Sequence, residues 1–304
     1  MGDQSTLDPA SRAAEEIAEL WWALFAVSAV VFAVVVALLL AGVLRRRGAA
    51  AEPDRRESRR GTWLVAAGGA VVPALVVVAF FFASVATLPA VAPPGDRARL
   101  TIDVVGRQWF WDVYYRNPTV RTSNEIHVPV GEPVELRVRT QDVIHSLWVP
   151  RLNRKIDLIP GQENAIVIEA RKAGFYRGQC AEFCGLQHAH MALFVVAEEP
   201  ARFRAWLARE ARPASANGAG PFLAAGCGGC HTVAGTTARS RYGPDLTHVA
   251  ARRTIAAGTL ALTRENLAAW IRDPQAVKPG SKMPVLGLGE RELRQIVAYV
   301  KSLR

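Results

Sequence analysis

Two long runs of uncharged, apolar residues constrain the fold of this 304-residue chain more than any other feature. The first run extends from Leu20 to Leu44, and the second extends from Gly61 to Pro89. At a rise of about 1.5 Å per residue, each run forms a helix long enough to cross the ~30 Å hydrocarbon core of a bilayer. The first is too long for a signal peptide and lacks a small-residue cleavage motif, and the second has no amphipathic period. The sequence therefore predicts a transmembrane hairpin over residues 20–89, with spans at 20–44 and 61–89.

The charged residues around these runs predict their orientation. Residues 45–60 contain seven arginines and three acidic residues, whereas residues 1–19 contain five acidic residues and one arginine. Membrane proteins keep arginine-rich loops in the cytoplasm. We therefore expect a two-pass protein of the bacterial cell (inner) membrane with a cytoplasmic loop at residues 45–60. The N-terminal tail at residues 1–19, and the whole chain after Pro89, then lie on the extracytoplasmic side.

The pattern of residues 95–200 predicts short β-strands. Val134, Leu136 and Val138 alternate with charged residues, which is the period of a half-buried strand. Further strand candidates are residues 100–105, 109–115, 143–149, 164–169 and 193–197. Glycine and proline punctuate the region, as expected for turns between strands. We therefore expect an all-β domain, built as an antiparallel barrel.

The segment Gln179–Met191 holds the densest group of soft metal ligands in the sequence. Its members are Cys180, Cys184, His188 and Met191. Thiolate, imidazole and thioether together suit copper, whereas structural zinc sites rarely recruit a methionine. Two bridging thiolates imply two copper ions, and each ion needs its own imidazole, so we expect the second imidazole from His145. A disulfide between the two cysteines is the alternative, but it leaves the histidines and the methionine unexplained.

The loop C-x-E-x-C-x3-H-x2-M, with the upstream sequence HS-x-W-VP, resembles the dinuclear copper (CuA) site of cytochrome c oxidase subunit II. The resemblance implies a cupredoxin-like Greek-key barrel in which Cys180 and Cys184 bridge the copper ions. It also implies that His145 and His188 are the terminal ligands. Met191 and the backbone carbonyl of Glu182 become the weak axial ligands.

Two further roles follow from the same resemblance. The side chain of Glu182 is expected to face a magnesium ion shared with subunit I. The aromatic run Gln108–Trp111 resembles a segment beside the copper site, in which Trp109 is the residue where electrons enter from cytochrome c. The alternative is that these aromatic side chains fill the barrel core, which we expect for Phe110 and for at least one tryptophan.

A second redox motif opens the C-terminal region. Cys227-Gly-Gly-Cys230-His231 is the C-x-x-C-H signature of covalent c-type heme attachment. Zinc would need further ligands nearby, and a thioredoxin-like site would need a following helix in a β-α-β unit. We expect Met283 as the sixth ligand of the heme iron, because it is the only methionine in this half of the chain. His248 is the rival ligand, although we expect it to be a surface or packing residue.

Residues 221–304 resemble the small class I cytochromes c, which implies an all-α cytochrome c domain. In that family the proline of Gly243-Pro-Asp-Leu246 provides the carbonyl that accepts a hydrogen bond from the proximal histidine. A terminal helix is expected to bury one apolar face, which is made of Leu293, Ile296, Val297, Val300 and Leu303. Residues 201–220 are expected to form a connecting helix and a flexible linker.

The charge of the chain is concentrated in its last part. Residues 214–304 contain twelve Lys and Arg against five Asp and Glu, hence +7, whereas residues 95–200 contain thirteen of each. Neither part has the aromatic-interleaved basic patch of a nucleic-acid binder, so no nucleic acid partner is expected. A basic heme domain fits an acidic electron donor or an anionic membrane surface.

Nearly the whole chain thus resembles subunit II of a heme-copper cytochrome c oxidase with a fused cytochrome c domain. The resemblance implies an oxidoreductase subunit that passes electrons from an external donor, such as a cytochrome c or a quinol:cytochrome c reductase, through heme c to CuA. Subunit I would then reduce oxygen to water, and subunit III and membrane lipid are further expected partners. A CuA subunit of a nitric-oxide-reducing relative remains an alternative. A membrane-tethered copper carrier is another, although a carrier needs no heme.

Overall fold

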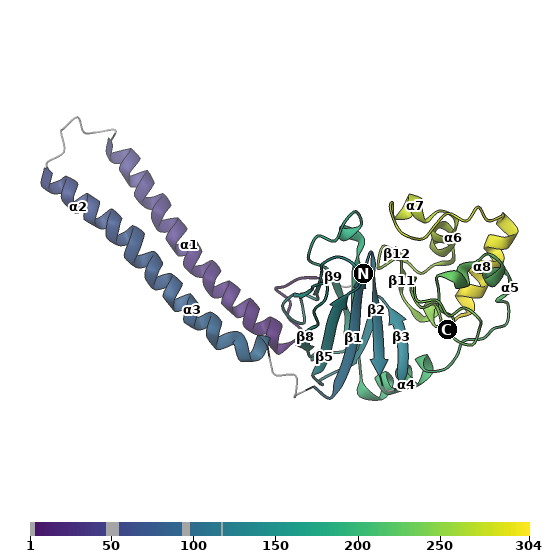
Figure 1. Cartoon of the computed structure of the whole chain (residues 1–304). Coiled ribbons are helices and arrows are strands. Elements are labelled where there is room, and N and C mark those ends of the chain that lie inside the picture. Colours follow the sequence, from purple (N-terminus) through teal and green to yellow (C-terminus); the bar gives the residue numbers. More distant parts are fainter. Residues whose placement is uncertain (1–3, 47–54, 93–97, 117) are drawn as a thin grey trace. The chain divides into compact units, whose positions relative to one another are not determined.

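The protein is described by a computed structural model that covers residues 4–46, 55–92, 98–116 and 118–304. Four parts of the predicted regions lie outside the described residues, namely residues 1–3 of the tail, 47–54 of the loop, and 95–97 and 117 of the barrel. The chain divides into two compact units, one of residues 15–91 and one of residues 1–14 and 92–304. Both units are drawn in Figure 1.

The smaller unit consists of long helical segments. Helix α1 spans Arg12–Arg46, and α2 (Arg55–Ala66) continues through a π-helical turn (Ala67–Val71) into α3 (Val72–Val91). The widened turn comes directly before Pro73, which cannot donate a hydrogen bond to the carbonyl of residue 69. Both helical stretches are long and apolar enough to cross a membrane, and their apolar windows are not buried in the protein. The apolar runs thus lie within helices that extend beyond them at both ends.

The end of the predicted N-terminal tail belongs to the larger unit, and helix α1 already begins at Arg12. The backbone N–H of Ala10 donates to the carbonyl of Arg151, and the hydroxyl of Ser11 donates to the carbonyl of Leu152. Within the larger unit, residues 10–11 are thus hydrogen-bonded to the β-domain.

The first part of the larger unit is a β-domain of two five-stranded sheets, in the orders β3-β2-β1-β5-β8 and β4-β10-β9-β6-β7. The strands are β1 (Leu100–Arg107), β2 (Phe110–Arg116), β3 (Thr119–Ser123), β4 (Glu125–Pro129), β5 (Val134–Thr140), β6 (His145–Trp148), β7 (Ile156–Leu158), β8 (Asn164–Ile168), β9 (Gly174–Cys180) and β10 (Ala192–Glu198). The all-β, cupredoxin-like fold class predicted from the sequence is confirmed. Two neighbouring pairs, β1 with β5 and β10 with β4, run parallel, so the sheets are mixed rather than purely antiparallel.

The core of the β-domain follows from alternation along its strands. In β5, Val134, Leu136 and Val138 are fully buried, while the charged residues between them are only partly covered. The same face-by-face burial places Trp111 in the core, as expected for one of the tryptophans. Helix α4 (Pro200–Glu210) then packs its Phe203, Trp206 and Leu207 against this core.

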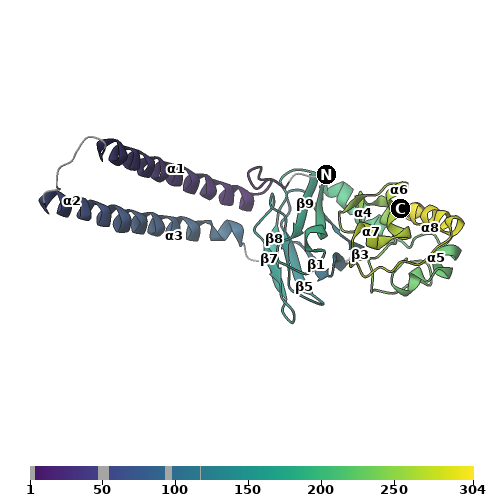
Figure 2. The same ribbon diagram turned by 90° about the horizontal axis from the view of Figure 1, so that it is seen from above.

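The second part of the larger unit is a cytochrome-like domain of short helices. They are α5 (Gly220–Ala224), α6 (Arg264–Arg272), α7 (Pro274–Val277) and α8 (Glu290–Ser302), with a two-stranded ladder of β11 (Thr254–Ile255) and β12 (Leu260–Ala261). The apolar face predicted for the terminal helix is buried. Both views show α5–α8 gathered next to the edge strand β3 (Figures 1 and 2).

The segment between the two domains is more fixed than a flexible linker. The backbone N–H of Ala214 donates to the carbonyl of Ala234, and the hydroxyl of Tyr299 donates to the carbonyl of Ser215. The segment is therefore hydrogen-bonded to the domain that follows it.

Candidate copper and heme sites

Two cysteines and two histidines of the predicted copper site converge at one end of the β-domain. Cys180 ends β9, and Cys184 lies in the loop that follows, with 3.7 Å between the two Sγ atoms. Nδ1 of His145, at the start of β6, lies 3.8 Å from Sγ of Cys180. Nδ1 of His188 lies 3.7 Å from Sγ of Cys184. Each sulfur thus has one imidazole beside it, and the two sulfurs face each other.

Two weaker donors complete the group. Sδ of Met191 lies 3.9 Å from Sγ of Cys184, and the carbonyl oxygen of Glu182 lies 3.2 Å from Sγ of Cys180. Met191 and both cysteines are buried, so water has little access to the sulfurs. All four cysteines of the chain are free, which is at odds with a disulfide.

The ligand atoms are close enough to share metal ions. Those of His145, Cys180 and Cys184 all lie within 4.8 Å of one another. The hydrogen bond between the two thiols lowers the pKa of Cys180 to about 3 and raises the pKa of Cys184, because a proton is held between them. This buried pair therefore has one thiolate that a soft cation can bind.

Asp142 orients the imidazole of His145. Its Oδ1 atom lies 2.8 Å from Nε2 of His145, which leaves Nδ1 directed to the sulfur. Its other oxygen accepts the backbone N–H of Gln108. Burial alone would raise the pKa of Asp142, but the contact with His145 and the backbone donors lower it to about 2. The carboxylate is therefore ionised and fixes the ring as metal sites require.

Gly106 makes room for this histidine. A Cβ atom at position 106 would lie 2.9 Å from Cδ2 of His145, which is too close for two carbons. The ring centroid of Trp111 lies 6.0 Å from the ring centroid of His145. Strands β1 and β2 thus pack against the ring of His145.

The heme motif lines a cavity of about 490 Å³, which is within the range of cofactor sites. The lining includes Cys227, Cys230, His231 and Met283 from the cytochrome-like domain. Nδ1 of His231 lies 2.8 Å from the carbonyl of Pro244, so Nε2 is the ring nitrogen left for a metal. The proline contact expected from the class I cytochromes c is therefore present.

His248 does not line this cavity. It is buried, and its Nε2 lies 3.0 Å from the carbonyl of Arg212. Met283 is partly buried against the domain core. Met283 lines the same cavity as the histidine motif and remains the predicted sixth ligand of the heme iron.

Trp109 belongs to both sites. Its indole Nε1 donates to the carbonyl of Cys184 at 3.0 Å, and the amide of Gln108 donates to the same carbonyl at 2.8 Å. Both residues also line the heme cavity, together with Phe110. The aromatic run therefore lies between the predicted copper ligands and the predicted heme ligands.

Comparisons with known proteins agree with this geometry. Residues 116–198 match the family described as cytochrome C oxidase subunit II, periplasmic domain, and residues 215–304 match the cytochrome c family. The chain belongs to the cytochrome c oxidase subunit II family. The subunit II domain implies a CuA copper site, and the cytochrome c domain implies a heme. Its β-domain is a periplasmic domain in this family, which places it outside the cytoplasm.

Curated relatives match about two thirds of the chain. The chain is 39% identical over 211 residues to cytochrome c oxidase subunit 2 of Alkalihalophilus pseudofirmus, covering 67% of this chain and 61% of the relative. It is 32% identical over 228 residues to that of Bacillus sp., covering 69% of this chain and 64% of the relative. The chain thus spans about three fifths of the length of these relatives. A solved periplasmic domain of subunit II from Bradyrhizobium japonicum is 33% identical, covers 37% of this chain and 94% of its own, and has a TM-score of 0.36.

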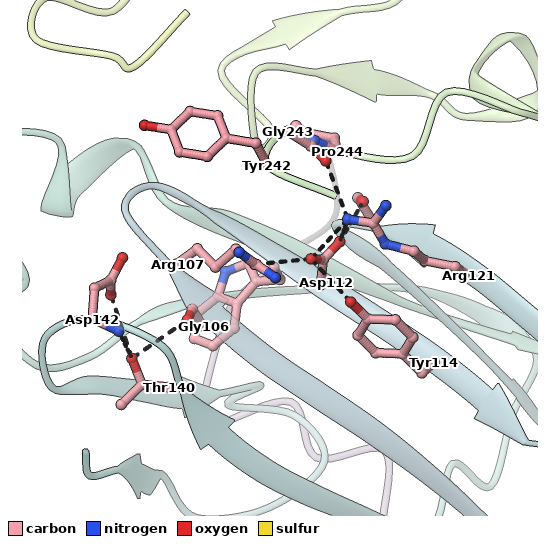
Figure 3. A network of polar contacts seen from close by, with 12 residues as sticks. Gly106, Arg107, Asp112, Tyr114, Arg121, Thr140, Asp142, Tyr242, Gly243 and Pro244 are labelled. Atoms are coloured by element: carbon pink, nitrogen blue, oxygen red, sulfur yellow. Dashed lines mark hydrogen bonds and ion pairs between the residues drawn. The ribbon is translucent and has the colours of Figure 1, made fainter. Parts of the chain in front are cut away.

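The structure also identifies residues that the sequence did not single out. Asp112 is fully buried and forms ion pairs with Arg107 at 3.0 Å and Arg121 at 2.9 Å (Figure 3). Arg121 in turn donates to the carbonyl of Gly243, next to the proline that binds the heme histidine. The contact of Arg121 with Gly243 joins residues that are 122 positions apart, so no local pattern could have revealed it.

Proposed function

We propose that this subunit carries single electrons from an external donor to oxidase subunit I. The electrons pass first through the cytochrome-like domain (the heme domain) and then through the β-domain (the copper domain). Oxygen is reduced to water in that partner subunit. The observation that carries the proposal is the position of Trp109. Its indole contacts the segment of the predicted copper ligands, Cys180 to Met191 (the copper loop), and the residue also lines the heme cavity. An electron that leaves the heme domain meets this residue directly beside the copper ligands.

The residues present fit both cofactors. Cys180, Cys184, His145 and His188 would hold the copper through their sulfur and Nδ1 atoms. Met191 and the carbonyl of Glu182 would be weaker donors to the same centre. When bound, such a centre shares one electron over two metals and a rigid thiolate bridge, so little has to move on electron transfer.

The heme would be held by thioether bonds to Cys227 and Cys230, and His231 and Met283 would be the residues that bind its iron. The carbonyl of Pro244 keeps the proton of His231 on Nδ1 and leaves Nε2 for the iron. Burial lowers the pKa of His231, which keeps the ring neutral and able to bind a metal. The chain thus provides a neutral imidazole from His231 and a thioether from Met283 for the iron.

The orientation in the membrane belongs to the same proposal. Both helical stretches span the bilayer, the arginine-rich loop lies in the cytoplasm, and both termini lie outside. The carboxylate of Glu182 is half-exposed and lies 3.9 Å from Lys155, so it is free to face subunit I and a magnesium ion there. Subunit III, a cytochrome c and a quinol:cytochrome c reductase are proposed partners of the assembled oxidase.

The test is Cys184→Ser in the purified oxidase. Removing one bridging sulfur should abolish the mixed-valence electron-spin signal of the copper centre and reduce the copper content, while the covalent heme remains. Oxygen uptake should fall by about 100-fold or more, because losing a residue of a cooperating catalytic unit costs at least that much. A delocalised two-copper signal in the variant would contradict the assignment. Nitric oxide uptake without oxygen uptake in the wild-type complex would instead favour the nitric-oxide-reducing relative.

A further inference from the structure

The heme domain contacts the β-domain through a continuous set of interactions within the larger unit. Arg121 donates to Thr232 and Gly243, and Glu125 accepts the backbone N–H of Arg253. The backbone N–H of Ala192 donates to the carbonyl of Ala257 at 3.0 Å. These contacts bring the two domains into direct backbone contact beside the copper loop.

Gly258 shows how close this approach is. Its φ of +78° lies in the left-handed region, and a Cβ atom there would lie 2.9 Å from Cβ of Ala192. A larger residue at either position would push the domains apart. The interface is therefore closely packed at the backbone level.

Lys278 is the most unusual contact of this interface. Its side chain is buried, and its Nζ atom donates to three carbonyl oxygens. These belong to Trp109 at 3.0 Å, His190 at 2.7 Å and Ala256 at 3.2 Å. Hydrogen bonds from one side-chain nitrogen thus connect the aromatic run, the copper loop and the heme domain.

The neighbouring residue strengthens the same connection. Gln187 of the copper loop donates from Nε2 to the carbonyl of Pro279 at 2.6 Å. Lys278 and Pro279 open the segment that ends at Met283, and Gln187 and His190 flank His188 and precede Met191. Lys278 and Gln187, called the clamp below, therefore connect the segment of the predicted heme ligand to the segment of the predicted copper ligands.

Burying an ammonium is costly, which argues that the contact has a purpose. Its partners are neutral carbonyls, and burial lowers the pKa of Lys278 to about 7, against the opposing effect of Cys184. A buried polar group without partners costs about 1–3 kcal/mol or more, and a charged group costs more still. A hydrophobic residue of the same length would fill this space without that cost.

We propose that Lys278 is a positioning residue for electron transfer, and that the clamp keeps the heme domain bound to the copper domain during turnover. This inference rests on the proposed function. One electron leaves the reduced heme domain and enters the copper domain, and no covalent bond is made or broken. The rate of that step depends on a fixed separation, which a domain that detaches and rebinds does not provide.

The test uses the complete, cofactor-loaded oxidase and the variant Lys278→Met, which keeps the apolar stem and removes the ammonium. A ruthenium complex excited by a light pulse donates one electron to the heme, and the reoxidation of the heme and the reduction of the copper are followed by absorbance. The rate of transfer between domains should fall by roughly tenfold or more, because the preorganised geometry is lost. The heme absorbance spectrum and the electron-spin spectrum of the copper should stay as in the wild type.

Lys301→Met is the matched control. Lys301 also donates to a backbone carbonyl, that of Leu262, but within the heme domain. This variant loses the same charge and should transfer electrons at the wild-type rate. A wild-type rate in Lys278→Met, or an equal loss in Lys301→Met, overturns the proposal.

Gln187→Leu provides a second variant if Lys278→Met does not accumulate with both cofactors. It removes the contact with Pro279 and should slow the same step with both spectra unchanged, and an unchanged rate here also overturns the proposal. Missing copper or heme signals in the wild-type protein would instead contradict the proposed function. The two failures are therefore distinguishable.

Discussion

Asp142 fixes which nitrogen of His145 is available to copper, since its carboxylate holds the other ring nitrogen at 2.8 Å. In Asp142→Asn the side chain keeps its shape but loses the charge that orients the ring. We expect the copper affinity to fall by about 10–100-fold, as is usual for such partners of metal-binding histidines. Competition with a copper chelator measures this. Asp103→Asn, which removes the partner of Arg116 elsewhere on the same domain, should leave the affinity unchanged.

Met283 is predicted to set the potential of the heme. In Met283→Ala the heme should stay covalently attached through Cys227 and Cys230, but its reduction potential should fall, because a methionine ligand raises the potential. A redox titration of the heme band measures the shift. Val285→Ala changes an exposed residue of the same segment and should leave the potential unchanged. An unchanged potential in Met283→Ala would mean that another ligand binds the iron.

At the residue scale, the sequence predicted the side chains whose chemistry is intrinsic. Cysteine, histidine and methionine at these spacings indicate metal and heme chemistry before any fold is known, and the structure brings them together. Asp142 could have been noticed as a carboxylate three residues before His145. Lys278 and Arg121 could not, because their roles arise from carbonyl oxygens that lie 22 to 169 residues away in the chain.

At the scale of elements, helix α4 packs on the ring of a buried histidine of the β-domain. Its Trp206 stacks on the ring of His127 with 3.9 Å between centroids, and that ring lies between Glu125 and Glu198. Burial lowers the pKa of His127, but the hydrogen bonds with both glutamates outweigh it, so the pKa lies above its ordinary value. His127 thus joins β4 and β10 under the helix.

This arrangement predicts a pH dependence of stability. Because the folded pKa is raised, the stabilisation is complete below the unfolded pKa of about 6.5 and is lost as the pH rises through the folded value. The urea midpoint of the β-domain in the detergent-solubilised protein should therefore decline as the pH rises above 6.5. His127→Gln should remove most of this slope. His248→Gln, at a histidine that contacts a backbone carbonyl, should keep it.

The elements themselves were predicted unevenly. Strands with strict alternation, such as β5, were found because one face is buried and the other is not. Strands β3, β4, β7 and β9 were missed. In β4 all five residues are buried, so no alternation remains to be read. Strand β9 carries Gly174, Gly178 and Arg177, which dilute its β-forming pattern. Parallel pairing of β1 with β5 also follows only from the tertiary fold.

At the scale of the whole chain, the sequence gives the order of domains but not their contact. A segment rich in proline, alanine, serine and glycine suggested a heme domain on a flexible tether. In the structure that segment is hydrogen-bonded, and the heme domain lies against the copper domain through Lys278, Arg121 and Gly258. The composition of a linker determines its flexibility in isolation. In the folded protein, contacts between the domains limit that flexibility.

The last prediction concerns the order of the two redox centres. Because Trp109 lines the heme cavity and also donates to the carbonyl of Cys184, we expect an external donor to reach the copper loop most directly through the heme. In Cys180→Ser the copper site is destroyed while the heme cavity is untouched. The donor should still reduce the heme, and the heme should then stay reduced in air because its exit is closed. Oxygen uptake should collapse in parallel, whereas Asp103→Asn should behave as the wild type in both assays. Normal reoxidation of the heme with continued oxygen uptake in Cys180→Ser would show that electrons reach subunit I without the copper centre, and the proposed order would be wrong.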